Sequence, residues 1–511
     1  MKTSVYNYFE ETAERCGGKT AVIEDHQSWT FGQLQQATHA LAGLLMHMVI
    51  RPNAIIAVLL KKSFRTVVSD LAITGVGCAY MNLDMKSPAD RIGQILGVIS
   101  PVLVITDTQG LALLQQIEDC KVPALDLDGV SMFAVEAADS VGNPGNSRLA
   151  VIIDTDPYCI INTSGSTGTP KGVVLNHRSF IDFVQWSASE LGINGSEVAG
   201  SLSPVIFDIF SYELCMLAFM GSTLCLIDER LSPYPAKILE ILDTRRVSYL
   251  FWVPTIMVNI VNMRLLDKFK LADLKMVWFA GEVFPTSHFN KWFDRFPGVR
   301  FVNLYGPIEI TLDCTYHEVQ ERLADDQPIP MGKPCRNTAL LVLNNDGSET
   351  PEGSIGELHV RGTSTAMGYY NNPEQTARAF IQNPLNNNYP EIIYKTGDLV
   401  LRSDDIYYFK GRADTMVKHL GYRIELADIE HAILSGVPEV KNVCVVYVQK
   451  RKEIIAYCEV SKPLNFQGFK NHLSRKVPAY MIPSRLEEIG EMPMNPNGKI
   501  DRLYFKKLAG E

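Results

Sequence analysis

Apolar runs that alternate with helical patterns constrain the fold of this chain more than any other feature. Residues 54–60, 79–83 and 102–105 are short, unbroken apolar runs, and a stretch with helical spacing of apolar residues precedes each one. Such runs are typical of parallel strands that helices cover on both faces. The same alternation returns between residues 222 and 304. The pattern predicts an α/β protein whose ligands bind beyond the carboxyl ends of the strands.

The pattern of turn residues and apolar segments changes twice toward the C-terminus. From about residue 331, Gly, Pro and Asn turns separate short alternating strands, which predicts an antiparallel β subdomain over about 331–412. Residues 413–511 combine hairpin signals with two helical stretches and predict a small α+β domain. Because 511 residues exceed what one hydrophobic core serves, we expect a large N-terminal domain over residues 1–412 that is itself layered.

The composition narrows the class of protein and its partners. Apolar residues make up 46% and charged residues 21%, as in soluble globular proteins, and a net charge of −9 argues against nucleic-acid binding. The ten cysteines form no CxxC pair and indicate reduced packing residues, which favours the cytoplasm. The first 16 residues lack the apolar core of a signal peptide, and the apolar window at 40–50 is too short to span a bilayer. We expect no membrane partner.

A loop rich in Gly, Ser and Thr lies between two apolar runs at residues 158–175. Such a loop after a strand turns backbone N–H groups toward an anion, and Lys171 adds a positive charge. It is not a Walker A loop, because Pro170 precedes Lys171 and Gly172 follows it, so no Lys-Ser/Thr step opens a helix. A flexible turn is the alternative to a polyphosphate cradle. The predicted cradle contains Thr163, Ser164, Gly165, Ser166, Thr167, Gly168 and Lys171.

Two further loops follow predicted strands and would meet the cradle at one crevice. One contains Gly281 and Glu282, and the other contains Tyr305 and Gly306. The carboxyl ends of parallel strands share one edge of a sheet, so we expect both loops to contribute to nucleotide binding.

Eight motifs occur in a fixed order along nearly the whole chain. Each one is weak alone, but eight in register make a chance resemblance implausible. They are residues 77–84, 163–172, Phe207-Asp208, 305–309, 356–370, 394–398, 411–425 and 497–501. On these motifs the chain resembles the acyl- and aminoacyl-adenylating superfamily, and most closely the adenylation domains of nonribosomal peptide synthetases.

The resemblance implies a two-step ligase that uses ATP and Mg²⁺. ATP and a carboxylate give an acyl-adenylate and pyrophosphate, and a phosphopantetheine thiol then takes the acyl group as a thioester. Such catalysis is mainly positioning and electrostatics. Lys499 resembles the family's catalytic lysine between the substrate carboxylate and the α-phosphate, and Glu309 resembles its magnesium-side carboxylate. The alternatives are a solvated lysine and an acid that satisfies a helix N-terminus.

The resemblance also assigns the nucleoside contacts. Asp398 matches the acid that accepts both ribose hydroxyls, for which two carboxylate oxygens are suited. Tyr305 matches the aromatic residue that stacks on adenine, and Arg412 is expected near the ribose. Asn303 is expected to read the adenine amino edge, although a plain strand residue explains it equally well.

In the family, a hinge lets the small domain change position between the two steps. The resemblance places the hinge at Asp414, with a mobile C-terminal lid beyond it. The lid withdraws Lys499 after adenylation and brings the segment around Gly421 toward the thiol channel.

One position departs from the family pattern. Ile308 stands where the family usually has a Thr whose hydroxyl contacts the α-phosphate. The loss of one neutral hydrogen bond costs about 1 kcal/mol, so we expect weaker nucleotide binding or a compensating donor such as Thr311 rather than an inactive enzyme.

The acyl pocket is defined by an acid. In amino-acid-activating relatives the residue at Asp208 pairs with the substrate α-ammonium, and a buried carboxylate requires such a partner. Bulky Tyr212, Phe251 and Trp278 leave room for a short side chain only, with alanine or serine ahead of larger amino acids. Asp313 would accept a hydroxyl or amine, or lie at the rim. The predicted pocket comprises Phe207, Asp208, Ile209, Tyr212, Phe251, Trp278, Ala280, Leu304, Leu312 and Asp313.

Three alternatives differ in class. The sequence ends eleven residues after Ile500, so we expect a stand-alone enzyme that loads a separate acyl or peptidyl carrier protein, and D-alanine–carrier protein ligases share this layout. An acyl- or aryl-CoA ligase is disfavoured by Asp208. A nucleotide-binding regulatory protein without chemistry is supported only by Ile308 and opposed by Lys499 and Glu309.

Overall fold

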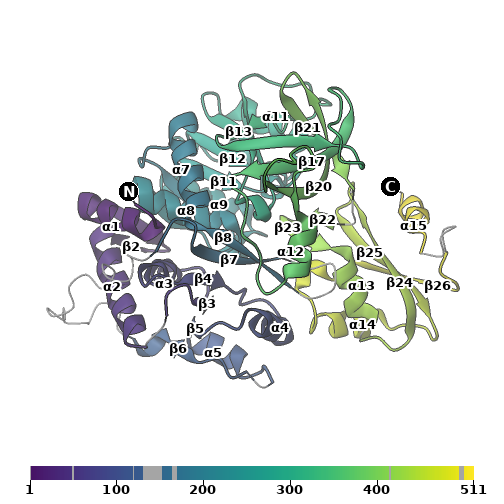
Figure 1. Cartoon of the computed structure of the whole chain (residues 1–511), viewed down its shortest axis with the longest axis horizontal. Coiled ribbons are helices and arrows are strands. Elements are labelled where there is room, and N and C mark those ends of the chain that lie inside the picture. The colour runs from purple at the N-terminus through teal and green to yellow at the C-terminus, as the bar shows by residue number, and fades with distance from the viewer. Residues whose placement is uncertain are drawn as a thin grey trace.

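The computed structural model of the chain describes residues 2–48, 51–118, 120–130, 152–163, 170–413, 416–434, 436–493 and 500–510. The predicted residues Ser164, Gly165, Ser166, Thr167, Gly168, Asp414 and Lys499 lie outside these ranges. Two large mixed sheets, one smaller antiparallel sheet and a C-terminal α+β segment make up the described parts (Figure 1).

The larger sheet has nine strands in the order β15-β14-β13-β12-β11-β9-β10-β1-β2. Its central strands run parallel, and the edge pairs β13–β14, β14–β15 and β1–β2 are antiparallel. Its strands are β1 (Thr20–Glu24), β2 (Gln27–Thr30), β9 (Val198–Ser201), β10 (Thr223–Leu226), β11 (Tyr249–Trp252), β12 (Met276–Phe279), β13 (Arg300–Tyr305), β14 (Thr315–Val319) and β15 (Lys333–Pro334).

The second sheet has seven strands in the order β18-β8-β7-β4-β3-β5-β6. The five residues of β3 are all buried, as expected for a parallel strand covered on both faces. Its strands are β3 (Ile55–Leu59), β4 (Ala79–Asn82), β5 (Leu103–Thr106), β6 (Ala124–Asp126), β7 (Pro157–Thr163), β8 (Lys171–Asn176) and β18 (Gly368–Tyr369).

Helices fill the space between these two sheets and cover their outer faces. One buried apolar cluster joins α1, α2, α3, α7 and α8 to strands of both sheets, while α9–α11 and α4–α5 pack on the two outer faces. This layering confirms the predicted α/β class. The helices are α1 (Val5–Cys16), α2 (Phe31–His47), α3 (Phe64–Gly75), α4 (Ala89–Ile99), α5 (Thr108–Leu114), α7 (His177–Leu191), α8 (Asp208–Met220), α9 (Pro235–Thr244), α10 (Pro254–Asn262) and α11 (Thr286–Arg295).

Strands β7 and β8, which flank the predicted cradle, form an antiparallel pair and not the parallel arrangement of their neighbours. Thr163 pairs with Lys171 at the end of this hairpin where residues 164–170 connect the two strands. Only seven residues separate these two, which is too short for the crossover that parallel strands need. The hairpin therefore holds Thr163 and Lys171 side by side at the strand ends.

The third sheet is antiparallel, as the turn-rich sequence predicts. Its order is β16-β17-β20-β19, with β21 paired to β20. The elements of this region are β16 (Thr338–Leu343), β17 (Ile355–Gly362), α12 (Pro373–Ala379), β19 (Phe380–Gln382), β20 (Ile392–Ser403) and β21 (Ile406–Arg412).

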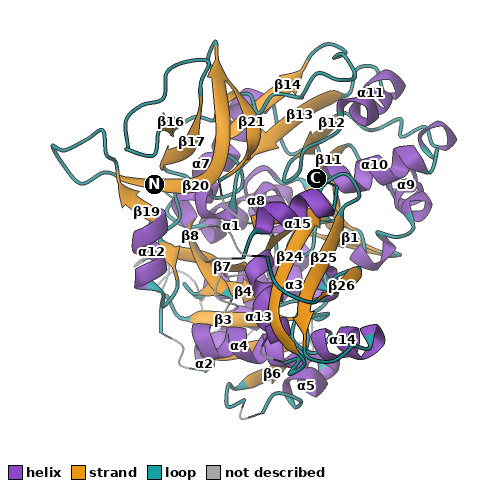
Figure 2. Ribbon diagram, turned by 90° about the vertical axis from the view of Figure 1, so that its right-hand side faces the viewer, coloured by secondary structure: helices purple, strands orange, loops and turns teal. Residues whose placement is uncertain are grey.

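The C-terminal segment, residues 416–510, has its own apolar core and lies against the rest of the molecule (Figure 2). Helices α13 and α14 cover one face of its three-stranded sheet, and α15 covers the other. Helix α14 ends earlier than its apolar pattern suggests. The elements are β22 (Met416–His419), β23 (Tyr422–Glu425), α13 (Leu426–Leu434), β24 (Val440–Val448), β25 (Glu453–Val460), α14 (Phe466–Leu473), β26 (Arg485–Ile489) and α15 (Arg502–Leu508).

Candidate functional site

A cavity of about 860 Å³ lies where the ends of the nine-stranded sheet, the antiparallel sheet and the C-terminal segment meet. This volume is in the range of binding sites for ligands of nucleotide size. Predicted site residues on its wall are Phe207, Asp208, Ile209, Phe251, Ala280, Gly281, Gly306, Leu312, Asp313, Asp398 and Arg412. Residues as far apart in sequence as Phe207 and Arg412 thus converge, as the strand-end rule predicts.

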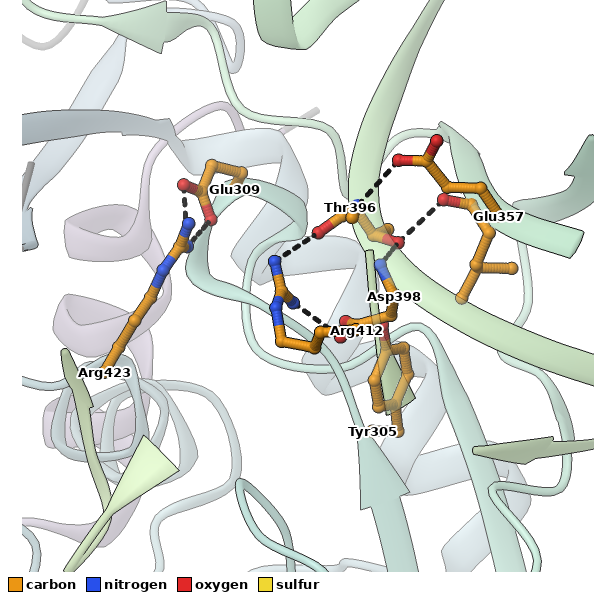
Figure 3. Close-up of polar contacts among 9 residues, drawn as sticks. Tyr305, Glu309, Glu357, Thr396, Asp398, Arg412 and Arg423 are labelled. Carbon is orange, nitrogen blue, oxygen red and sulfur yellow. Dashed lines mark hydrogen bonds and ion pairs between the residues drawn. The ribbon is translucent and has the colours of Figure 1, made fainter. Parts of the chain in front are cut away.

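One wall of the cavity carries a carboxylate that accepts two hydrogen bonds from the protein (Figure 3). Asp398 on β20 is buried, and its Oδ1 accepts from Arg412 Nη1 at 2.5 Å while its Oδ2 accepts from the Tyr305 hydroxyl. Arg412 also donates to the Thr396 carbonyl at 3.1 Å. A carboxylate offers about four lone-pair directions, so two remain for a diol after these two bonds. The three predicted nucleoside residues, Asp398, Arg412 and Tyr305, are therefore one hydrogen-bonded unit.

Another part of the cavity wall carries an acid in largely apolar surroundings. Asp208 is the first residue of α8, and the backbone N–H of Ile209 donates to its Oδ1 at 3.0 Å. Burial beside Phe251, Ala280 and Leu312 raises the pKa of Asp208 to about 6, although the helix N-terminus favours its charged form. An acid so placed gains most from a cationic ligand.

Large rings close the floor below Asp208. Tyr212 stacks on Trp278 with ring centroids 5.6 Å apart, and Phe251 meets Trp278 edge-on at 5.6 Å. Of these three only Phe251 reaches the cavity wall, while Tyr212, Trp278 and Leu304 pack beneath it. These packed rings form a rigid base for this part of the cavity, because tightly packed interiors do not yield to extra volume.

A second acid and a lysine face the same cavity. Asp313 is 3% exposed, and burial together with the nearby Asp208 charge raises its pKa well above the ordinary value. Lys418 of β22 lies 5.8 Å from the Tyr305 ring, and burial lowers its pKa. Sequence reasoning missed Lys418, because only the docking of the C-terminal segment brings it here.

Thr163 and Lys171 pair at the strand ends where the sequence predicted the phosphate cradle. The Thr163 hydroxyl is buried and has no hydrogen-bond partner in the described parts of the chain, and neither has the Asn162 amide nitrogen. Asn162 and Thr163 line a small pocket together with Ile308 and Arg423. Orphaned buried polar atoms beside a Gly-rich loop fit an anionic ligand that would satisfy them.

Glu309 is fully buried and already has partners (Figure 3). Arg423 Nη1 donates to its Oε1 at 2.8 Å and to its Oε2 at 2.6 Å, and the Tyr369 hydroxyl donates to Oε1 at 2.8 Å. Burial alone would raise the pKa of Glu309, but Arg423 and Tyr369 outweigh it and hold that pKa below its ordinary value. The motif pointed to Glu309, whereas Arg423 and Tyr369 were not predicted as site residues.

The chemistry of this side suits magnesium with phosphates. Mg²⁺ in nucleotide sites takes one or two carboxylates and completes its shell with phosphate and water oxygens. Glu309 is one such carboxylate, and the described residues contain no cluster of three or more potential metal ligands. A cation at Glu309 would therefore depend on nucleotide phosphates for its other ligands.

Two predicted nucleotide residues are engaged elsewhere. Glu282 accepts from the Thr255 N–H at 2.9 Å, at the start of α10, and from the Gly421 N–H at 2.8 Å. Asn303 donates to the Pro330 carbonyl at 2.6 Å and does not line the cavity. Glu282 thus fastens the C-terminal segment to the strand ends.

The loop after β13, which contains Ile308 in place of the family's usual Thr, shows backbone strain. Thr311 and Leu312 both have positive φ, at 50° and 67°, which is rare for residues other than Gly. Ile308 lines the cavity, whereas Thr311 is fully buried and its hydroxyl has no partner among the described residues. Thr311 does not line the cavity, so the compensating donor suggested by the sequence stays a prediction.

Comparison with known proteins adds independent support. The model of the family described as AMP-binding enzyme matches residues 9–370. Zwittermicin A synthase ZmaJ of Bacillus cereus is 31% identical over 100% of this chain and 96% of its own length. An L-proline–[L-prolyl-carrier protein] ligase of Streptomyces coelicolor is 31% identical over 92% of this chain and 90% of its own. The chain spans only 8% to 44% of several longer synthases that it also matches.

Solved structures agree on the fold. The amide bond synthetase McbA from Marinactinospora thermotolerans superimposes with a TM-score of 0.86 at 21% identity, covering 98% of this chain and 99% of that one. None of the described helices is long and apolar enough to cross a membrane. The family match covers residues 9–370, most of the chain, and two relatives align over nearly their full length. The chain belongs to the AMP-binding enzymes, the adenylate-forming ligases whose relatives include nonribosomal peptide synthetase adenylation domains.

Proposed function

We propose that this enzyme activates a small α-amino acid as its aminoacyl-adenylate and loads it onto a separate carrier protein. The observation that carries the proposal is Asp208, a carboxylate with a pKa of about 6 on the wall of a largely apolar cavity. An α-ammonium group would stabilise the ionised form of this partly buried acid, whereas a fatty or aryl acid would leave it unpaired.

In the first step the substrate carboxylate attacks the α-phosphorus of ATP. A bond forms between a carboxylate oxygen and the α-phosphorus, while the bond from the α-phosphorus to the oxygen that bridges to the β-phosphate breaks. Pyrophosphate then leaves. Asp208 orients the amino acid, and Asp398 with Arg412 and Tyr305 holds the nucleoside, so the two anions meet in a fixed geometry. We assign charge neutralisation between them to Lys499.

Glu309, Thr163 and Lys171 would serve the departing phosphates. When bound, Mg²⁺ neutralises charge on the phosphates and is held by Glu309. Thr163 supplies an unpartnered buried hydroxyl, and Lys171 a cation whose pKa burial and Arg423 lower. These residues bind and orient the leaving group.

In the second step a phosphopantetheine thiol attacks the acyl carbon. The sulfur forms a C–S bond, the C–O bond to AMP breaks, and the thiol proton is released. The contact of Gly421 with Glu282 supports a thioester-forming arrangement of residues 413–511 relative to a core domain of residues 1–412. We place the hinge at Asp414. The name of the related L-prolyl-carrier protein ligase supports a carrier protein as acceptor.

The floor of Tyr212, Trp278 and Phe251 supports a short substrate side chain, with alanine or serine first. A pyrophosphate-exchange panel over all proteinogenic amino acids and the D-enantiomers of alanine and serine tests this. We expect exchange with one or two small amino acids. Exchange only with fatty or aryl acids would overturn the proposal, and a preference for D-alanine would select the D-alanine–carrier protein ligase alternative.

A further inference from the structure

Lys62 links the two large sheets at the carboxyl ends of their strands. It lies between β3 and α3, partly buried, and its Nζ donates to the backbone carbonyls of Ser201 at 2.7 Å and Ser203 at 3.1 Å. Ser201 is the last residue of β9 in the nine-stranded sheet, and Ser203 lies on the wall of the cavity. One ammonium group therefore holds the start of the connection that leads from β9 to Asp208.

A fully buried acid holds the same connection from its other side. Glu213 lies in α8, the helix that Asp208 begins, and its Oε2 accepts from the Ser201 hydroxyl at 2.5 Å. Its Oε1 is buried and has no hydrogen-bond partner among the described residues. Burial raises the pKa of Glu213 and lowers that of Lys62, and each charge favours the ionised form of the other. A carboxylate this deeply buried is stable as an anion only beside a cation, which Lys62 provides.

The segment held in this way forms part of the acyl side of the cavity. Residues 202–207 join β9 to α8, and several of them line the same cavity as Asp208. The hydrogen bond between Ser201 and Glu213 ties the residue before this segment to the helix that follows it. The segment and the first turn of α8 are therefore one closed loop of chain, so a shift of the segment would move Asp208 relative to the other walls.

A second lysine makes the same kind of contact at the opposite end of β9 and α8. Lys19 Nζ donates to the carbonyls of Gly195, which precedes β9, and Gly221, which ends α8. Neither glycine is among the described residues that line the cavity. The strand and the helix are thus held by a lysine at each end, and Lys62 is the one at the cavity.

We infer that Lys62, Ser201 and Glu213 are positioning residues for the amino acid, which set the place of Asp208 and the adjoining cavity wall without touching the substrate. The inference rests on the proposed function, because it takes Asp208 as the acid that binds the substrate ammonium. A buried network in which hydrogen bonds and opposite charges support one another holds the attached groups rigidly. It acts on binding of the amino acid and leaves the nucleoside residues on other strands in place.

Pyrophosphate exchange by the full chain, titrated separately with ATP and with the best substrate of the amino acid panel, tests this role. We expect Lys62→Met to raise the KM for the amino acid about tenfold and Ser201→Ala about fivefold, because each removes hydrogen bonds that hold the segment. The maximal exchange rate should stay within about twofold of the wild type and the KM for ATP should not change. The double variant should raise the KM by much less than the product of the two single effects, since members of one network are not additive.

Lys19→Met is the matched control, because it removes a lysine that donates to two carbonyls at the far end of the same helix. In calorimetry it should lower Tm about as much as Lys62→Met does, while the KM for the amino acid stays at the wild-type value. Glu213→Gln is the conservative variant. Its amide oxygen still accepts from Ser201, so the KM should stay within about threefold of the wild type.

The outcomes separate the inference from the proposed function. If the wild type shows no exchange with any amino acid, or if Asp208→Asn keeps the wild-type KM, the proposed function fails. If Asp208→Asn raises the KM but Ser201→Ala does not, or if Lys19→Met raises it as much as Lys62→Met, the network only stabilises the fold and the inference alone falls. Should Lys62→Met fail to fold, Ser201→Ala, which removes a single buried oxygen, still decides between these outcomes.

Discussion

The two carboxylates Asp208 and Glu309, to which the sequence assigned different parts of the site, have pKa values shifted in opposite directions. Asp208, on the acyl side, is partly buried, and the loss of hydration raises its pKa to about 6; the described contacts give it no ion pair, although the nearby Lys418 charge favours its ionised form. Glu309, on the phosphate side, is more deeply buried, yet its pKa lies below the ordinary value because Arg423 and Tyr369 donate to it.

The difference shows which end of the site waits for a ligand. A buried acid is stable as an anion only with a partner. Glu309 receives its partner from the protein in this arrangement. Under the proposed function, Asp208 would receive its partner from the substrate ammonium, with Lys418 acting on it only from a distance.

Removing the acid on the acyl side should give the largest effect. We expect Asp208→Asn to lower kcat/KM for the amino acid in pyrophosphate exchange by about 10²- to 10³-fold, because a substrate ammonium left unpaired costs about 3–5 kcal/mol. The KM for ATP should change little, since the nucleoside residues are untouched. A variant that keeps wild-type kcat/KM would show that Asp208 does not bind the α-ammonium.

Protonation of Asp208 predicts that kcat/KM for the amino acid decreases at low pH. The substrate ammonium needs the charged form of Asp208, whose pKa is about 6. As pH falls through 6 the carboxylate takes up a proton, so kcat/KM for the amino acid should fall up to tenfold per pH unit, as a profile at saturating ATP would show. A flat profile between pH 5 and 7 would contradict the assignment.

The sequence predicted both acids but not the contrast between them. Asp208 and Glu309 are recognisable because short motifs surround them, and the apolar runs at residues 54–60 and 79–83 predicted the buried strands. Arg423 and Lys418 reach the site only through docking of a segment about a hundred positions later in the chain. Tyr212 and Trp278 were expected on the pocket wall but lie one layer beneath it, because residue type does not reveal depth in a packed core.

Weakening the docked contact should separate the two chemical steps. In Gly421→Ala the new Cβ would lie 3.1 Å from Val253 Cγ1, and its φ of 83° disfavours a side chain by about 1–2 kcal/mol. We expect transfer to the carrier to slow about tenfold while pyrophosphate exchange is unchanged. Gly353→Ala is the matched control, because Gly353 has φ of 78° but open space around it. Equal losses in both steps would argue against a role confined to docking.

The smallest effect concerns stability and the second acid of the acyl side. Burial and the Asp208 charge raise the folded-state pKa of Asp313 above its unfolded value, so its contribution to stability is present below about pH 4 and is lost as pH rises toward the folded-state pKa. The Asp313→Asn variant has no carboxylate at this position and therefore does not lose this stability as pH rises. Relative to the wild type, the variant should therefore gain about 1–3 °C in Tm between pH 5 and pH 7.5.

Differential scanning calorimetry at the two pH values measures that gain, with exposed Asp326→Asn as the control for removing a negative charge. If both variants change equally with pH, net charge explains the result and Asp313 carries no special cost. If only Asp313→Asn gains, the acyl side holds two acids that the empty pocket cannot satisfy. Adding the cognate amino acid with ATP should then reduce the difference between wild type and variant, because the substrate ammonium lies between the charges that oppose folding.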